Sequence, residues 1–352
     1  MIEILKDILP YISGLYTLPW ILVGFILTII ISKFTEREKI DKIMKKIGII
    51  LLYFFVPVLL FRIFLNTNFA EEQIKFSIIV TAIIFFMYLL AFVFAKYNIK
   101  KQNLTGEKKS LYLKTVLTNQ GRSSAFIGGA MLAIEAWAVP AGIYMALVGI
   151  ALFAVIPYIL SHMHKKELKK VAQAKNPLPW FLKLYPWYLI SFVIAAVAIH
   201  GTMNITTNTL GDSGFLLIFY TAITIPAALY YVGAGIHPTD LKLSEMKKLI
   251  GLDKRSTKDD HWNWVRGIFI LTVIITPILT VIIFYPFLAL QIIPSSWFAV
   301  IIINSVLPVT STNMFLISYG IDKKSTAHVV TWTTLLCVPI VVFLIALFTF
   351  IY

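Results

Sequence analysis

The sequence predicts an all-α polytopic membrane protein with ten transmembrane helices, and three observations support this fold class. The 352 residues are 59% hydrophobic and only 14% charged, whereas about a quarter of the residues in a typical soluble domain are charged. Apolar runs of about 20 residues, the length that crosses a bilayer as a helix, recur along the whole chain. Basic residues concentrate in alternate connections between these runs, as they do in the cytoplasmic loops of membrane proteins.

Ten segments of the chain are long and apolar enough to be predicted as transmembrane helices. Their approximate bounds are Leu9–Ser32, Ile43–Leu65, Ile74–Ala95, Leu111–Ile134, Ala138–Ser161, Leu184–His200, Gly214–Ile236, Val265–Leu288, Trp297–Tyr319 and Thr326–Ile351. The connections at residues 162–183 and 238–264 are charged and mixed in sign. We therefore expect them to be cytosolic linkers rather than a further domain.

The distribution of Lys and Arg predicts which side of the membrane each connection faces. All but four of the 31 Lys and Arg residues lie around residues 33–46, 96–114, 165–183, 242–266 and 323–324. The exceptions are Lys6 and Lys75 on the opposite side, and Arg62 and Arg122 inside predicted spans. The positive-inside rule therefore predicts a multi-pass protein of the plasma membrane with both termini outside. The net charge of +14 is divided among short loops, which favours contact with membrane lipid and argues against a nucleic-acid partner.

The two halves of the chain carry similar motifs in the same order, which predicts an internal repeat. Residues 1–161 and 184–352 each contain five predicted spans, on either side of a linker at residues 162–183. The matched positions are Pro19-Trp20 with Pro186-Trp187, Pro57 with Pro226, Asn119 with Asn304, and Pro157 with Pro339. Because five is an odd number, the second half must enter the membrane from the opposite side, which makes the repeat inverted.

Two predicted spans, Leu111–Ile134 and Trp297–Tyr319, are interrupted by polar residues near their centres. A lipid-facing helix does not tolerate such clusters, so these residues must face protein, water or a ligand. We expect both helices to break inside the membrane, with a half-helix starting after each break. The residues predicted to ease the breaks are Gly121, Gly128, Gly129 and Pro308. The residues predicted to bind a substrate are Asn119, Arg122, Ser123, Ser124, Asn304, Pro308, Thr310, Ser311 and Asn313.

Arg122 is the basic residue placed deepest in a predicted span, and the sequence leaves two interpretations of it open. It could bond to backbone carbonyls freed by the helix break, as a purely structural group. It could instead present its planar fork of donors to a carboxylate, which arginine binds better than lysine does. No acidic residue lies deep in any of the ten spans to pair with it, which favours an anionic substrate.

Other residues that often carry chemistry do not form a recognisable site. No Cys pair, histidine pair at helical ligand spacing or acidic cluster is present, and Cys337 is the single cysteine, so we expect no metal. We also expect no cofactor and no enzymatic activity, because paired acids, nucleophile–base pairs and ATP-binding motifs are absent. Arg62 is expected to snorkel or to contact Glu71 or Glu72. His328 is expected to be a hydrogen-bonded structural histidine, with a proton carrier as the alternative.

Three short motifs resemble the auxin efflux carrier family, whose larger group includes bile-acid sodium symporters. They are Val56-Pro57-Val58-Leu59-Leu60-Phe61, Phe126-Ile127-Gly128, and the segment from Asn304 to Tyr319-Gly320. The resemblance implies ten helices in two inverted five-helix repeats, with helices 4 and 9 broken and crossing at a substrate site in mid-membrane. It also implies an organic anion, such as auxin or a small carboxylate, carried without ATP, and adds a homodimer as an option. Ser123 and Ala130 stand where the family often has Asn and Pro, and Arg122 is not expected there.

The leading functional hypothesis is a secondary transporter of a small organic anion that works by alternating access. A sodium-coupled symporter of an amphipathic organic anion is the alternative within transport. A membrane receptor or sensor that binds a ligand without moving it is the alternative from a different class. The sequence does not distinguish the direction of transport or the coupling ion.

Overall fold

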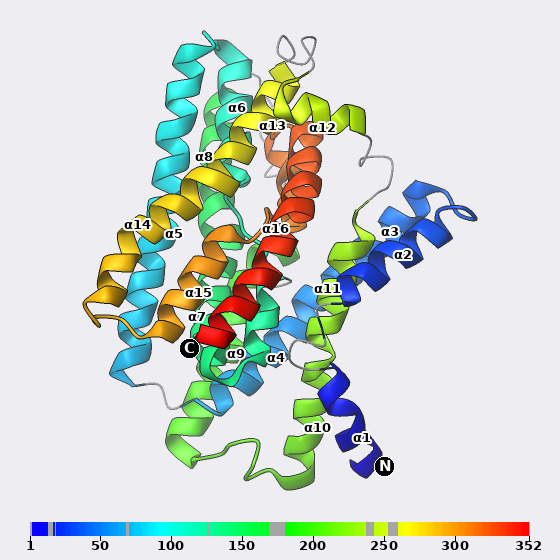
Figure 1. The fold of residues 1–352 in the computed structure, drawn as a ribbon, viewed down its shortest axis with the longest axis vertical. Helices are drawn as coiled ribbons and strands as arrows, with labels where there is room; N and C mark the ends of the chain where they lie inside the picture. The colour runs from blue at the N-terminus through cyan, green and yellow to red at the C-terminus, as the bar shows by residue number, and fades with distance from the viewer. Residues whose placement is uncertain are drawn as a thin grey trace.

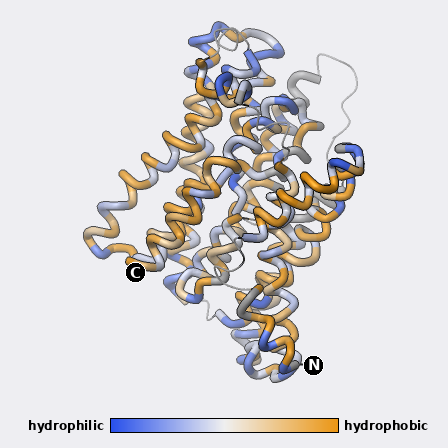
Figure 2. Tube along the Cα trace, turned by 45° about the vertical axis from the view of Figure 1, so that its right-hand side comes forward, coloured by the Kyte–Doolittle hydropathy of each residue, from blue (hydrophilic) through white to orange (hydrophobic). Residues whose placement is uncertain are grey.

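The computed structural model of the protein describes residues 2–12, 17, 19–67, 70–124, 127–168, 180–236, 243–252 and 260–351. Within these residues every regular element is a helix, and the only β-type pairing is a single isolated bridge. The helices form an elongated bundle (Figure 1). Apolar residues cover most of its length, while hydrophilic residues gather toward the two ends (Figure 2).

Sixteen α-helices are present in the described part of the chain. They are α1 (Ile2–Ile8), α2 (Trp20–Ile31), α3 (Arg37–Ile50), α4 (Val56–Leu65), α5 (Glu71–Lys101), α6 (Gly106–Thr118), α7 (Glu135–Ile150), α8 (Ile156–Leu168), α9 (Trp180–Met203), α10 (Gly211–Ala222), α11 (Thr224–Ala234), α12 (Leu243–Ile250), α13 (Asp260–Phe269), α14 (Thr276–Ala289), α15 (Ser295–Val306) and α16 (Lys323–Ile351).

In the described part of the chain, five helical stretches are long and apolar enough to cross a membrane. They are Glu38–Leu65, Glu71–Lys101, Gly211–Ala234, Asp260–Ala289 and Lys323–Ile351. Shorter apolar helices cover Trp20–Ile31, Glu135–Ile150, Trp187–Met203 and Ser295–Val306. The predicted all-helical class is therefore confirmed and the long apolar helices suggest a membrane-embedded protein, while the count of ten spans stays a prediction.

Among the described residues, three π-helical segments each end two residues before a proline. These segments are Leu51–Phe55 before Pro57, Ala151–Val155 before Pro157, and Ile270–Ile275 before Pro277. Proline has no N–H to donate, and in an α-helix its ring clashes with the carbonyl four residues earlier. Widening the preceding turn relieves the clash, so each helix continues past its proline instead of ending there.

Two predicted spans differ from the helices that form. The span expected at Leu9–Ser32 begins as a 3₁₀ turn at Leu9–Ile12, and an α-helix starts only at Trp20, directly after Pro19; residues 13–16 and 18 lie outside the described residues. The span expected at Gly214–Ile236 divides at Ile223 into α10 and α11. Pro226 explains the division, because it cannot donate to the carbonyl of Ala222 and its ring would press on that carbonyl.

Helix α2 packs on α11, and α4 packs on α9. The first of these contacts is unusually close, because Gly24 and Gly233 bring the two backbones together. A Cβ atom added at Gly24 would overlap the carbonyl oxygen of Tyr230, and one added at Gly233 would overlap that of Ile21. Small residues that permit such approach are typical of packed membrane helices.

The remaining main contacts pair α5 with α6 and α7, α14 with α15, and α13 with α16. The turn between α5 and α6, helix α12 and the first turns of α13 and α16 gather at one end of the bundle, which we call the basic end (Figure 1). An apolar cluster beneath it joins α5, α6, α13 and α16, and includes Tyr112 and Trp264, whose ring centres are 5.2 Å apart. This packing holds the beginning of α16 beside α6 and α13.

Candidate functional site

The first interrupted segment begins where α6 ends at Thr118. The amide of Asn119 still donates to the carbonyl of Thr115, but Gln120 and Gly121 donate only three residues back, which tightens the turn and stops the helix. Residues 125–126 lie outside the described residues, and a 3₁₀ segment follows at Gly128–Ala133. The predicted break is therefore present, and the helical segment that follows it is a short 3₁₀ helix.

The second interrupted segment begins where α15 ends at Val306. Leu307 is extended, with φ −51° and ψ 142°, because the ring of a following proline disfavours the helical conformation in the residue before it. Pro308 donates no hydrogen bond, and Thr310 is extended as well. The half-helix that follows is a 3₁₀ segment at Ser311–Tyr319, and Gly320 ends it in the left-handed conformation at φ 75°.

The two breaks lie against each other in an antiparallel arrangement. Arg122 and Val309 form the isolated β-bridge. The amide of Ser123 donates to the carbonyl of Pro308 at 2.9 Å, and the amide of Thr310 donates to the carbonyl of Gly121 at 2.9 Å. Backbone groups that the broken helices can no longer satisfy are thus paired across the two segments, as groups shielded from water must be. We call this contact the crossover.

Gly121 lies at the crossover in close contact with two side chains. A Cβ atom on this residue would lie 2.7 Å from Oδ1 of Asn313 and would overlap the side chain of Leu152. Gly128 and Gly129 are buried in the following 3₁₀ segment, where a Cβ added at Gly128 would lie 2.9 Å from the side chain of Leu307 and one added at Gly129 would meet only Ile225, at 3.9 Å. Of the glycines predicted to ease the break, Gly121 and Gly128 are both tightly packed by side chains, whereas Gly129 is not.

Arg122 is buried at the crossover, with 2% of its surface exposed. Its Nη1 donates to the carbonyl of Leu307 at 3.3 Å, and its Nη2 donates to the carbonyl of Thr272 at 3.0 Å. Its Nε has no hydrogen-bond partner among the described residues. Carbonyl oxygens solvate the guanidinium but do not neutralise it, so a full positive charge remains in the protein interior.

The carbonyl of Thr272 is available to Arg122 because of Pro277. In a regular helix this carbonyl would accept from the amide of Thr276, but the π-helical turn directs that amide to Leu271 instead. The next residue that could donate is Pro277, which has no N–H. Sequence reasoning missed Thr272, although Pro277 was the signal that could have found it.

The electrostatic surroundings of Arg122 contain weak acids rather than carboxylates. Tyr88, Tyr144 and Cys337 interact electrostatically with its guanidinium. Among the described residues, every ion pair lies away from the crossover, and none includes Arg122. A buried charge without an ionic partner is costly in a low-dielectric interior, so an anion would be attracted to this position.

The remaining predicted polar residues line the same contact. Ser124 donates through Oγ to Oδ1 of Asn304 at 3.0 Å, and Asn304 donates to the carbonyl of Val300 at 2.9 Å. Asn119 donates to the carbonyl of Thr115 at 2.8 Å and to Oγ1 of Thr326 at 3.1 Å. These bonds tie the two interrupted segments to each other and to α16.

The structure buries eight of the nine predicted binding residues. They are Asn119, Arg122, Ser123, Ser124, Asn304, Pro308, Thr310 and Asn313, and the side chain of Ser311 lies outside the described side chains. Ser123 and Pro308 contribute backbone groups to the crossover. Thr310 uses its hydroxyl locally, 3.0 Å from that of Thr312.

Several buried polar atoms around the breaks have no hydrogen-bond partner within the described part of the chain. They are Oγ1 of Thr118, Oδ1 of Asn119, Oε1 of Gln120, Nε of Arg122, and both Oδ1 and Nδ2 of Asn313. Buried polar groups are nearly always bonded, and leaving one unbonded costs about 1–3 kcal/mol. Their concentration here marks the crossover as the strongest candidate site for a polar ligand.

A separate apolar groove of about 580 Å³ lies between α5 and α14 and extends to Trp297. Its one charged lining residue is Lys75, which pairs with Glu71 at 2.8 Å. The groove contains none of the crossover residues, so we do not assign it to the same site.

The pairing of Glu71 with Lys75 also corrects the expectation for Arg62. Arg62 instead donates to the carbonyl of Ile218 at 3.3 Å.

The fold and the crossover define the protein as an all-helical protein with apolar helices of membrane-spanning length. A search against models of known protein families finds no match, and a search of curated protein sequences finds none. The described residues contain no group of three or more His, Cys, Asp or Glu side chains placed to hold a metal ion.

Proposed function

We propose that this protein is a secondary transporter of a small organic anion, built on the plan of the auxin efflux carriers. In this proposal it lies in the plasma membrane as a multi-pass protein with both termini outside, and the crossover is the substrate site. The observation that carries the proposal is Arg122, a buried cation without an ionic partner among the described residues, held where two interrupted helices meet. A carboxylate would supply the missing charge and would bond to a guanidinium.

The helix contacts support the inverted repeat that alternating access requires. If the first five predicted spans correspond in order to the last five, the contact of α2 with α11 corresponds to that of α9 with α4. The contacts of α5 with α6 and α7 likewise correspond to those of α14 with α15 and of α13 with α16. Two halves whose helix contacts correspond in this way can exchange conformations. The protein then has two equivalent arrangements, one open to each side of the membrane.

The function is tested by transport in liposomes that contain only this protein. Small carboxylates and aromatic acids are applied one at a time, and both electrical current and uptake of labelled solute are measured against protein-free liposomes. Flux of at least one carboxylate supports a carrier, and its chemistry identifies the substrate class. Binding of a carboxylate with no flux would favour the receptor or sensor alternative instead.

Sodium coupling is a second candidate, and one observation favours it. Oδ1 of Asn119, Oε1 of Gln120 and Oδ1 of Asn313 are buried oxygens without described partners, and neutral oxygens are ligands that hard cations accept. The measurement is the same anion uptake with sodium replaced by potassium or choline. Uptake that requires sodium establishes a symporter, and uptake that does not depend on the cation rules out sodium coupling.

A further inference from the structure

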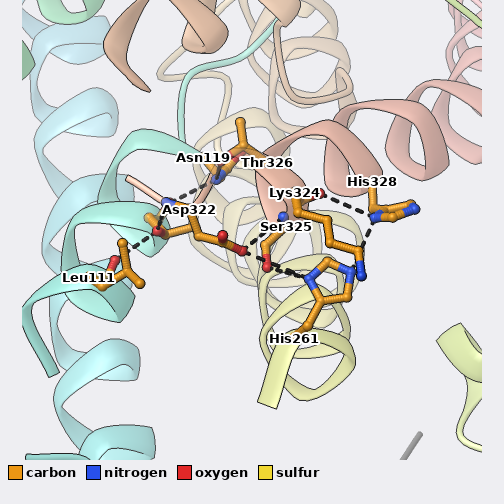
Figure 3. Close-up of polar contacts among 9 residues, drawn as sticks. Leu111, Asn119, His261, Asp322, Lys324, Ser325, Thr326 and His328 are labelled. Carbon is orange, nitrogen blue, oxygen red and sulfur yellow. Dashed lines mark hydrogen bonds and ion pairs between the residues drawn. The ribbon is translucent and has the colours of Figure 1, made fainter. Parts of the chain in front are cut away.

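Two histidines meet at the basic end. His261 lies at the beginning of α13 and His328 in the second turn of α16, and Nε2 of His261 is 3.1 Å from Nδ1 of His328 (Figure 3). The other ring nitrogen of His261, Nδ1, is 2.9 Å from Oγ of Ser325 and 3.8 Å from Oδ2 of Asp322. Both rings lie close to Trp262, with centroid separations of 5.4 and 5.2 Å.

The partners of the pair indicate where its protons lie. Nδ1 of His328 is 3.2 Å from the carbonyl of Lys324, which can only accept, so this nitrogen carries a hydrogen. Nε2 of His261 must then be the acceptor in the contact between the rings. His261 accordingly carries its own hydrogen on Nδ1, where it can donate toward Ser325 and the carboxylate of Asp322.

This arrangement has room for one further proton but not for two. An added proton on Nε2 of His328 leaves the Nδ1 hydrogen between the two rings, and the positive charge is shared across a charge-assisted hydrogen bond. A second added proton would place two hydrogens between nitrogens only 3.1 Å apart, which the contact cannot accommodate. The pair therefore binds protons as a unit.

The charges around the pair favour a single added proton. Asp322 is the nearest carboxylate. Burial raises its pKa, but hydrogen bonds to His261 and Ser325 outweigh this and lower the pKa to about 2, so Asp322 is ionised whenever an imidazole titrates. The ammonium of Lys248 lies 5.8 Å from the centre of the Trp262 ring and opposes an added charge, so Asp322 is the group that favours the proton. The other charged groups of the neighbouring elements are the exposed Lys323 and Lys324, Lys248 with Glu245, Arg266 with backbone carbonyls, and Asp260 with Lys108.

We propose that His261 and His328 form a binding site for one proton, with Asp322 as its counter-charge, and that this proton strengthens the attachment of α16 to α6 beside the crossover. The attachment passes through Asp322 itself. Its amide donates to Oγ1 of Thr115 in α6 at 2.9 Å, and its carboxylate accepts from the amide of Ser325 in α16 at 2.9 Å.

The same attachment reaches the first break directly. Asn119, the residue at which α6 ends, donates to Oγ1 of Thr326, the neighbour of Ser325 (Figure 3). The positive charge shared by the two rings draws the Asp322 carboxylate toward Nδ1 of His261, while the Asp322 amide continues to donate to Thr115. Proton binding at the basic end is thereby connected to the end of α6 through two hydrogen bonds, that of Asp322 to Thr115 and that of Asn119 to Thr326.

The proton site is tested by counting imidazolium rings in the intact protein. Histidine labelled with ¹⁵N is incorporated, and spectra in nanodiscs are recorded from about pH 9 to about pH 5 for the wild type, His261→Gln, His328→Gln and the double variant. A shared site gives one added proton in the wild type, one in each single variant and none in the double variant. Two added protons in the wild type, or no change in either ring, would overturn the proposal.

Two further variants examine the environment of the pair. Asp322→Asn keeps an acceptor for the Ser325 amide but removes the charge, so the added proton should bind only at lower pH. His162→Gln replaces an exposed histidine of α8 and should leave the His261 and His328 signals unchanged. If Asp322→Asn leaves the titration of the pair where it was, Asp322 is not the counter-charge.

The link to the crossover is tested by amide hydrogen exchange. After correction for the intrinsic pH dependence, protonation should slow exchange at the end of α6 and the first turn of α16 roughly fivefold, since a charge-assisted hydrogen bond is about twice as strong as a neutral one. The His261→Gln/His328→Gln double variant should lose this change in exchange, and His162→Gln should keep it. Equal exchange in the wild type, the double variant and His162→Gln would refute the link. A pH dependence of anion flux that matches this protonation would rest on the proposed function. Absence of flux would count against the proposed function alone, because the histidine titration and the hydrogen exchange are measured without a substrate.

Discussion

The replacement of Arg122 by methionine separates a structural role of this residue from a role in anion binding. Methionine has a similar length but no charge, and it leaves the carbonyls of Leu307 and Thr272 without the donors that now lie 3.3 and 3.0 Å away. Each unsatisfied carbonyl costs about 1–3 kcal/mol, although measured side-chain hydrogen bonds within membranes average only about 0.6 kcal/mol. Removing a buried charge offsets part of this loss. We therefore expect the free energy of unfolding to fall by about 1–2 kcal/mol, which leaves a folded protein.

The expected effect on anion binding is much larger than the effect on stability. Removing one partner of a buried, hydrogen-bonded charge pair costs about 2–5 kcal/mol, so carboxylate affinity should fall by at least about 30-fold. Arg62→Met is the matched control, because Arg62 also donates from Nη1 to a backbone carbonyl, that of Ile218 at 3.3 Å. It should lower stability without lowering carboxylate flux.

The assay combines carboxylate flux in liposomes with chemical denaturation of the same preparations. Arg122→Lys belongs in the series, because it keeps the positive charge but lacks the planar fork, and it should retain part of the flux. Normal flux in Arg122→Met, or an equal loss of flux in Arg62→Met, would show that the arginine at the crossover is structural. The buried charge of Arg122 would then not be the group that attracts an anion.

Three further changes test the packing and the polar contacts. Gly233→Ala forces a Cβ atom onto the carbonyl of Ile21 and should destabilise the protein by about 1–3 kcal/mol in thermal unfolding, whereas Gly201→Ala, which meets nothing within 4 Å, should be neutral or stabilising. Asp322→Asn should lower stability at neutral pH by up to about 2 kcal/mol. Because the folded-state pKa of Asp322 is lowered from 3.8 to about 2, the advantage of the wild type should disappear in denaturation measured as the pH falls through that interval. Thr326→Val removes the acceptor for Asn119 and should cost about 0.5–1.5 kcal/mol; an equal loss when Asn119 is already alanine would show that the two side chains are not coupled.

The sequence predicted the helical class and the two breaks because both follow from local chemistry. Long apolar runs form helices wherever backbone groups must be bonded without water, and Pro308 forces its neighbour Leu307 out of the helical conformation. The break after Asn119 was predicted from a cluster of polar residues and Gly121, a glycine that packs closely against Leu152 and Asn313. What local chemistry did not supply was the conformation after each break, which is 3₁₀ rather than α.

The partners of Arg122 were beyond reach because they depend on contacts between distant segments. Leu307 and Thr272 are more than a hundred residues away, and a carbonyl carries no side-chain signature. The pairing of His261 with His328 has the same origin, since one residue lies in α13 and the other in α16. His328 was expected to be hydrogen-bonded and is, but its ring partner could not be inferred from a sequence that shows two isolated histidines.

The two interpretations of Arg122 that the sequence left open are compatible once its contacts are known. A guanidinium has five N–H donors, and the bonds to Leu307 and Thr272 use only two of its three nitrogens. Those bonds fix the orientation of the group in the absence of a ligand, which reduces the entropy lost when an anion binds. They also leave its charge intact, so the free energy of burying that charge remains to be offset. A structural arginine held by carbonyls is therefore already prepared to bind an anion, and flux in the Arg122 variants will decide whether the protein uses it.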